Sequence, residues 1–221
     1  MGGNGMKYAA LIASTLASLA FPATEAVSEE NLSDALLKGR PYIDARYRFE
    51  AVDQDGFTEN AGASTLRTKI GFETKSYKGF SALLEGENVT TIGRQKFNDT
   101  VNGRTQFPVV ADPEITELNQ GYINYDGIFD TAFRIGRQRI RLDNQRFIGT
   151  VTFRQNEQTF DAVRITNKSL DSTTARYFYV DNVNRVLAPN RRSVTFGPIP
   201  TSSTRNTTGS SWALWSVTPT C

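Results

Sequence analysis

The sequence predicts an all-β fold, an antiparallel meander of long strands joined in turn by short and long connections. Three observations lead to this prediction: apolar and charged residues alternate in several segments, the segments are long for strands, and their connections alternate in length. The chain has 221 residues, which is enough for one domain or for part of a larger one.

The N-terminus, residues 1–26, has the features of a signal peptide. Lys7 precedes an apolar run at residues 9–21, and small residues follow that run. The run is too short for a membrane-spanning helix, which needs about 20 apolar residues, and its alternative interpretation is a buried helix. We therefore expect cleavage after Ala20 or Ala26 and export of the chain.

Residues 27–39 predict a short lead-in helix before the first strand. Asn31 or Ser28 can cap the N-terminus of this helix, and Gly39 can end it. From Arg40 onward the apolar residues recur with a period of about 2 rather than about 3.6, which indicates strands.

The segment RPYIDARYRFEAV, which starts at Arg40, has the clearest alternation in the chain. One face carries Ile43, Ala45, Tyr47, Phe49 and Ala51, and the other carries Asp44, Arg46, Arg48 and Glu50. Six further strands are predicted at residues 64–75, 80–88, 117–125, 131–139, 158–167 and 173–182. Short connections lie near residues 76–79, 126–130 and 168–172, and longer ones at residues 53–63, 91–115 and 140–156.

Two architectures can use such strands. In a soluble β-sandwich the apolar faces pack on each other, whereas in a transmembrane β-barrel they face lipid and the charged faces line the lumen. The predicted strands have about 9 to 12 residues, which suits a tilted membrane-spanning strand, whereas strands of soluble proteins average about 5 to 6. Aromatic residues near strand ends, the alternation of connection lengths and the export signal also favour the barrel. The sandwich remains the alternative.

The predicted barrel is incomplete. Residues 40–187 supply about seven strands, whereas single-chain bacterial outer-membrane barrels close with an even number and leave no unpaired edge in lipid. We therefore predict the N-terminal part of a larger barrel. Residues 188–221 are rich in Ser, Thr, Pro and Asn and predict an irregular tail, either from a truncated or frame-shifted reading or as a natural disordered tail.

Composition excludes several functions. The chain has no histidine, so a Ser-His-Asp triad, a Cys-His pair and a His-ligated metal are excluded, and its only cysteine is Cys221. With 25 Lys and Arg against 23 Asp and Glu, the chain is not a nucleic-acid-binding polycation. DQDG at residues 53–56 lacks the further ligands of a calcium loop, and DPE at residues 112–114 predicts loop structure or, secondarily, a constriction or cation site. We predict no enzyme activity, no metal and no cofactor.

Basic residues gather on the polar faces of the strands and in one run near the middle of the chain. From Arg134 to Arg154 there are six arginines and a single acid, Asp143. Some of these arginines lie in or beside a connection that could fold into the lumen. The predicted pore-lining residues are Arg46, Arg48, Arg67, Lys69, Arg134, Arg137, Arg139, Arg146, Arg154, Arg164 and Arg176.

Such a surplus of arginine favours anions, and the planar guanidinium group binds carboxylates through two hydrogen bonds. The alternative is that these charges pair across strands with acids of the same face, such as Glu85 and Glu87, and only stiffen the wall. The two roles can coexist.

Five strings in fixed order resemble the alginate-export family of bacterial outer-membrane proteins. They are VVADPEITELNQGYINY from Val109, GRQR from Gly136, NQRFIG from Asn144, RQNEQTFDAVR from Arg154 and YVDNVNR from Tyr179. The resemblance covers roughly residues 40–187. It implies a large β-barrel with an electropositive pore that exports an anionic polysaccharide in some members and serves porin-like diffusion in others.

Together, the residues and the resemblance predict a porin-like channel in the outer membrane that passes anionic or carbohydrate solutes. Its expected partners are outer-membrane lipid and an anionic solute or polysaccharide. Two alternatives stay open: a secreted or periplasmic β-sandwich that binds carbohydrate or acts as an adhesin, and an enzyme that works without histidine.

Overall fold

The computed structural model describes residues 31–142, 144–145, 148–170 and 173–187 in full, and the backbone of residues 9–19 and 212–219. Its elements are one short helix and nine strands. They are β1 (Ala9–Leu19), α1 (Leu32–Leu37), β2 (Arg40–Asp53), β3 (Ala61–Glu73), β4 (Phe80–Thr91), β5 (Ile115–Ile128), β6 (Thr131–Gln138), β7 (Thr159–Leu170), β8 (Thr173–Asn184) and β9 (Trp212–Pro219).

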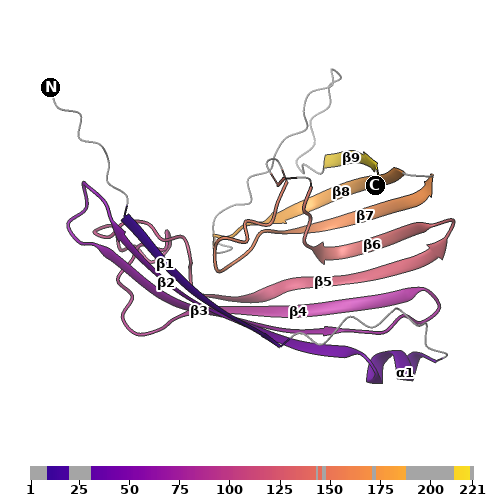
Figure 1. Cartoon of the computed structure of the whole chain (residues 1–221), viewed down its shortest axis with the longest axis horizontal. Helices are drawn as coiled ribbons and strands as arrows, with labels where there is room; N and C mark the ends of the chain where they lie inside the picture. Colours follow the sequence, from indigo (N-terminus) through magenta and orange to yellow (C-terminus); the bar gives the residue numbers. More distant parts are fainter. Residues whose placement is uncertain are drawn as a thin grey trace, which may run out of the picture.

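The strands form a single antiparallel sheet whose order follows the chain from β1 to β9 (Figure 1). The sheet curves into a half-barrel with short turns at one end and long connections at the other. This arrangement confirms the predicted all-β meander and incomplete barrel. The β-sandwich alternative requires two sheets, and all strands in the described part of the chain belong to one.

Two strands lie in segments for which no strand was predicted. β1 falls within residues 1–26, the predicted signal peptide, and its eleven residues pair with β2 from Ala9 opposite Asp53 to Leu19 opposite Ile43. β9 falls within residues 188–221, where an irregular tail was predicted, and pairs with β8. Trp, Leu and Val favour strands, so WALWSVTP has a local preference that its polar surroundings hid.

Helix α1 lies at the short-turn end of the sheet. The side chain of Asn31 caps it by accepting a hydrogen bond of 2.8 Å from the backbone N–H of Asp34. The backbone N–H of Lys75 donates to the carbonyl of Ala35, which fixes the helix beside the connection between β3 and β4. Among the described residues, no helix is long and apolar enough to cross a membrane.

The two faces of the sheet are inverted relative to a soluble protein. On the outer face large apolar side chains are exposed on consecutive strands: Ile70 of β3 is 63% exposed, Leu84 of β4 is 62%, Ile123 of β5 is 53% and Ile135 of β6 is 60%. On the inner face charged side chains such as Lys69 and Glu85 are buried. An apolar belt around a polar interior is the pattern of a transmembrane β-barrel, in which lipid covers the outer face.

Two long connections fold onto the inner face and bury it. In the connection between β4 and β5, Phe97, Phe107 and Val110 pack against Ala61 and Ala63 of β3. The connection between β6 and β7, residues 139–158, which we call the strap, places its residue Ile140 in a second apolar cluster with β7 and β8. The buried core therefore lies between the loops and the inner wall.

Candidate pore-lining site

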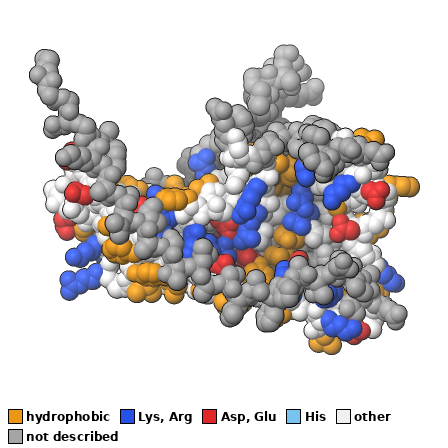
Figure 2. All heavy atoms as spheres, viewed as in Figure 1, with side chains coloured by type: hydrophobic (Ala, Val, Ile, Leu, Met, Phe, Trp, Pro, Cys, Tyr) orange, Lys and Arg blue, Asp and Glu red, His pale blue; other side chains and the backbone are white. Residues whose placement is uncertain are grey.

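The inner wall brings four predicted pore-lining residues of β2 and β3 together. Arg46 lies opposite Arg67 in the register of the two strands, and Lys69 of β3 lies opposite Glu87 of β4. Figure 2 shows Lys, Arg, Asp and Glu side chains gathered across the middle of the face in view. Since like charges on paired strands repel, these cations need acid partners on the same face.

Glu157 of the strap supplies the first of these partners. Its Oε2 accepts from Nε of Arg139 at 2.8 Å and its Oε1 from Nη2 at 2.6 Å, so the guanidinium group is held by two hydrogen bonds. The same carboxylate pairs with Nζ of Lys69, which also lies 3.0 Å from Oε2 of Glu87. Nη2 of Arg139 further reaches Glu85 at 2.7 Å. The carboxylates are buried, whereas the side chain of Arg139 is 28% exposed.

A second ion cluster lies nearer the long-loop end. Arg48 pairs with Glu50 of its own strand, and its Nε lies 3.9 Å from the carboxylate of Asp112. Arg154 of the strap lies 3.3 Å from Glu50 and 3.9 Å from the same oxygen of Asp112. Both guanidinium groups stack on the ring of Phe153, at 4.3 Å for Arg48 and 5.2 Å for Arg154. Asp112 of the DPE motif is thus a buried part of this network.

Gln155 fastens the strap to the wall and is fully buried. Its Nε2 donates to the hydroxyl of Thr65 at 2.9 Å, and its Oε1 accepts from Nε of Arg46 at 2.8 Å. Its backbone N–H donates to Asp112 at 2.8 Å. One neutral side chain therefore joins β2 and β3 to the strap, and its backbone joins the strap to the other long connection. Nothing in the local sequence distinguishes this neutral residue from the basic run around it.

Most cations of the inner wall over β2 to β5 are therefore paired with carboxylates. Arg46 is the exception, because it donates to neutral oxygens of Gln155, Thr152 and Arg154. Arg67 completes the pattern through a 2.6 Å contact with Asp44. The acids come from strands far from the basic run in sequence, so the run of six arginines does not leave a matching surplus of charge on this part of the wall. The predicted role of pairing across strands describes this half of the sheet.

The wall over β6 to β8 has a different balance, because three arginines lie on its inner face. Arg134 of β6 lies opposite Arg164 of β7, and Arg176 of β8 lies opposite Thr166. Arg164 feels the repulsive charge of both other arginines. Among the described residues, no carboxylate lies within ion-pair distance of Arg134 or Arg164. We call Arg134, Arg164 and Arg176 the arginine row.

Arg134 is held in place by neutral groups. Its Nε donates to the amide oxygen of Asn124 at 2.6 Å, and its guanidinium group stacks on the ring of Tyr122 at 3.9 Å. These contacts orient the guanidinium group without cancelling its charge.

The sequence that forms this architecture matches the model of a known protein family. The family model described as "Alginate export" matches residues 42–183, which is well over half of the chain. The chain belongs to the alginate-export family. The match spans β2 to β8, the inner wall and the strap. Comparison with curated proteins and with solved structures gave no match.

The alginate-export family is a family of outer-membrane β-barrel transport proteins rather than of enzymes, so the chain is at this level an outer-membrane transport protein. This agrees with the apolar belt on the outer face and the polar interior.

Two predicted pore-lining residues of this alginate-export chain do not join the inner clusters. Arg137 shares the parity of Phe133 and Ile135, which face outward, and its Nε donates to Asp161 at 2.8 Å. Arg146 lies outside the described residues.

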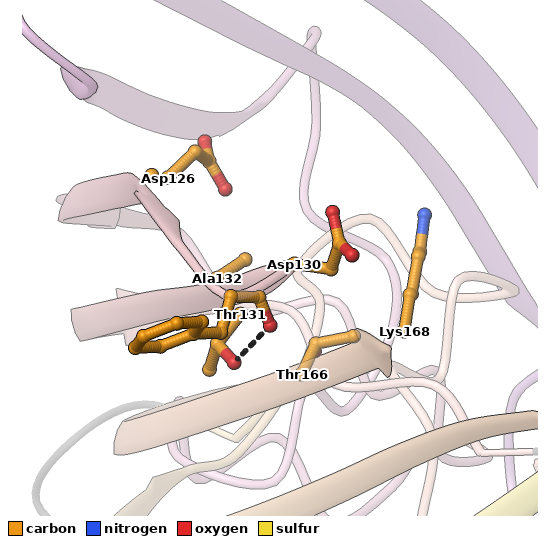
Figure 3. Close-up of a pocket in the computed structure, with 8 residues that line it drawn as sticks. Asp126, Asp130, Thr131, Ala132, Thr166 and Lys168 are labelled. Carbon is orange, nitrogen blue, oxygen red and sulfur yellow. Dashed lines mark hydrogen bonds between the residues drawn. The ribbon is translucent and has the colours of Figure 1, made fainter. Parts of the chain in front are cut away.

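At the short-turn end, a cavity of about 610 Å³ opens beside the arginine row. Asp126, Asp130, Thr166 and Lys168 line it, and Figure 3 shows the two carboxylates and the ammonium group pointing toward the same open side. Thr131 closes the turn by donating to the carbonyl of Phe129. Thr166, which lines the cavity, lies opposite Arg176 in the register of β7 and β8, so this cavity borders the arginine row.

Proposed function

We propose that the protein is an outer-membrane channel that passes anionic solutes, including acidic polysaccharide chains, along the arginine row. One observation carries the proposal. Over β2 to β5, Arg48, Arg67 and Lys69 have carboxylate partners. Arg46 of β2 donates instead to three oxygens of the strap. Arg134 and Arg164 of the row lie opposite each other and have no carboxylate within ion-pair distance in the described part of the chain. A permeating carboxylate or other anion is the partner that this part of the wall lacks.

The geometry of the row suits such an anion. Neighbouring strands lie about 4.8 Å apart, so the opposed Arg134 and Arg164 stand close enough for one anion to relieve their repulsion. Guanidinium binds a carboxylate through two parallel hydrogen bonds, and a rigid strand wall keeps the groups in position. Rows of opposite or unequal charge on a lumen wall select permeating ions by sign.

We further propose that residues 1–26 are a signal peptide that is removed on export. Its removal takes away β1 and frees the edge of β2. In a closed barrel every strand pairs on both sides, so this edge is where a closing strand pairs.

The proposal is tested by conductance. The complete barrel, expressed from its full reading frame, is inserted into planar bilayers, and the reversal potential is measured in a salt gradient. Anions carry most of the current if the proposal holds. In water, a positive unit charge about 10 Å from a permeating ion stabilises an anion by about 0.4 kcal/mol and destabilises a cation by the same amount. The two effects together change the anion-to-cation ratio about fourfold.

Arg134→Ala and Arg164→Ala should therefore each lower that ratio, by about fourfold at low salt. Arg94→Ala removes an equal charge from an exposed position of the connection between β4 and β5 and is the matched control. Cation preference in the unmodified channel, or a ratio unchanged by both row variants, would overturn the proposal.

A further inference from the structure

The strap crosses the inner face from one side of the half-barrel to the other. Near its start, Ile140 packs in the apolar cluster that contains Phe178 and Val180 of β8. Further along, the carbonyl of Thr152 accepts from Nη1 of Arg46 on β2 at 2.9 Å. β2 and β8 are six strand spacings apart, about 29 Å along the sheet, so the strap lies within the curve that becomes the lumen of a closed barrel.

The strap is a fixed part of the wall rather than a loose loop. Thr150, Gln155, Asn156 and Glu157 are all buried. The strap is fastened by Gln155 at β2 and β3 and by Glu157 at β3 and β5. It therefore sets the width and the charge of the passage beside it.

Glu157 sets the charge of the strap where it meets the inner wall. Its carboxylate touches Lys69 and Arg139 at once, and Nδ2 of Asn119 also donates to it at 3.0 Å. Arg139 is the partly exposed member of the group, so it presents its guanidinium group to the passage while two buried carboxylates hold it from behind. Without Glu157, the two cations would face only Glu85 and Glu87.

We infer that Glu157 is a specificity-determining residue of this channel. Glu85 and Glu87 already balance the charges of Lys69 and Arg139, so Glu157 makes this cluster net negative. That negative charge limits the anion preference that the arginine row produces on the opposite part of the wall. The inference rests on the proposed channel function and adds to it the residue that restrains selectivity. The channel accordingly has a side of mostly paired charges and a basic side, and the passing anion is drawn to the basic side.

The test uses the complete barrel with Glu157→Gln, which keeps the shape of the side chain and removes one negative charge. The anion-to-cation ratio from the reversal potential should rise about fourfold at low salt. Glu59→Gln removes the same charge from an exposed position between β2 and β3 and should leave the ratio unchanged. Heat-modifiable migration on a gel shows that each variant is folded.

Arg139→Gln separates an electrostatic role from a structural one. It removes the cation that Glu157 holds, so the ratio should fall, in the opposite direction to Glu157→Gln. A strap that merely came loose would shift both variants in the same direction. That result overturns the inference, as does an anion-selective channel whose ratio is the same with Glu157→Gln. An unmodified channel that prefers cations instead defeats the proposed function itself.

Discussion

Gln155→Ala should release the strap from the wall at a large cost in stability. The Gln155 side chain makes three neutral hydrogen bonds, to the hydroxyl and carbonyl of Thr65 and to the carbonyl of Arg46, and accepts one bond from the Arg46 guanidinium group. The two carbonyls belong to paired strands, so losing their additional bonds costs little. The bond to the hydroxyl is worth about 1 kcal/mol and the bond to the half-buried cation about 2 kcal/mol, so the variant should lose about 3 kcal/mol.

The assay is reversible denaturant unfolding of the barrel in detergent, which measures the change in the free energy of unfolding. Limited proteolysis provides a second readout, because a released strap exposes the backbone around Arg154. Gln158→Ala is the matched control. Gln158 has the same side chain at the end of the same strap, and its Nε2 makes one hydrogen bond, to the carbonyl of Gly149 at 3.0 Å.

We expect the control to lose about 1 kcal/mol and to keep its resistance to protease. If Gln155→Ala and Gln158→Ala have equal unfolding free energies, Gln155 does not fasten the strap, and the argument from its buried hydrogen bonds is refuted.

Three further predictions test other parts of the structure. Ile70→Lys places a charge on the outer apolar belt and should destabilise the inserted barrel by about 2–4 kcal/mol, measured by denaturant unfolding in lipid; an unchanged free energy would show that this face does not meet lipid. Gly136→Ala should impair folding by more than about 2 kcal/mol, because Gly136 has a φ of +123° and an added Cβ would lie 2.3 Å from a backbone oxygen of β5; Gly62→Ala, with nothing within 4 Å, is the control, and equal refolding yields would contradict the prediction. N-terminal sequencing of the protein from outer membranes should begin after Ala20 or Ala26, and a retained Met1 would disprove the signal peptide.

The alternation of the strands was enough to predict the sheet and its inner face. Arg48 and Lys69 could be assigned to the inner wall because their neighbours in sequence are apolar with the opposite parity. The same rule places Arg137 on the outer face with Phe133 and Ile135. The prediction that Arg137 lines the pore relied on the basic run instead of this alternation.

The ion clusters could not be predicted in the same way. Lys69 and Glu157 are far apart in the chain, and their contact depends on the register of three strands and on the path of the strap. The alternation in a single sequence shows which face of the sheet a residue lies on. It does not show which loop covers that residue. The surplus of charge between Arg134 and Arg154 therefore looked larger than the structure makes it, because Glu50, Glu85 and Asp112 approach from other elements.

The apolar cluster of Phe97, Phe107 and Val110 has a consequence for the shape of the passage. It covers Ala61 and Ala63 at the long-loop end, where Phe97 and Val110 are fully buried. Together with the strap, which reaches from β8 to β2, it takes up space inside the curve of the sheet. Under the proposed function, a polymer would have to pass this filled end of the barrel beside the arginine row.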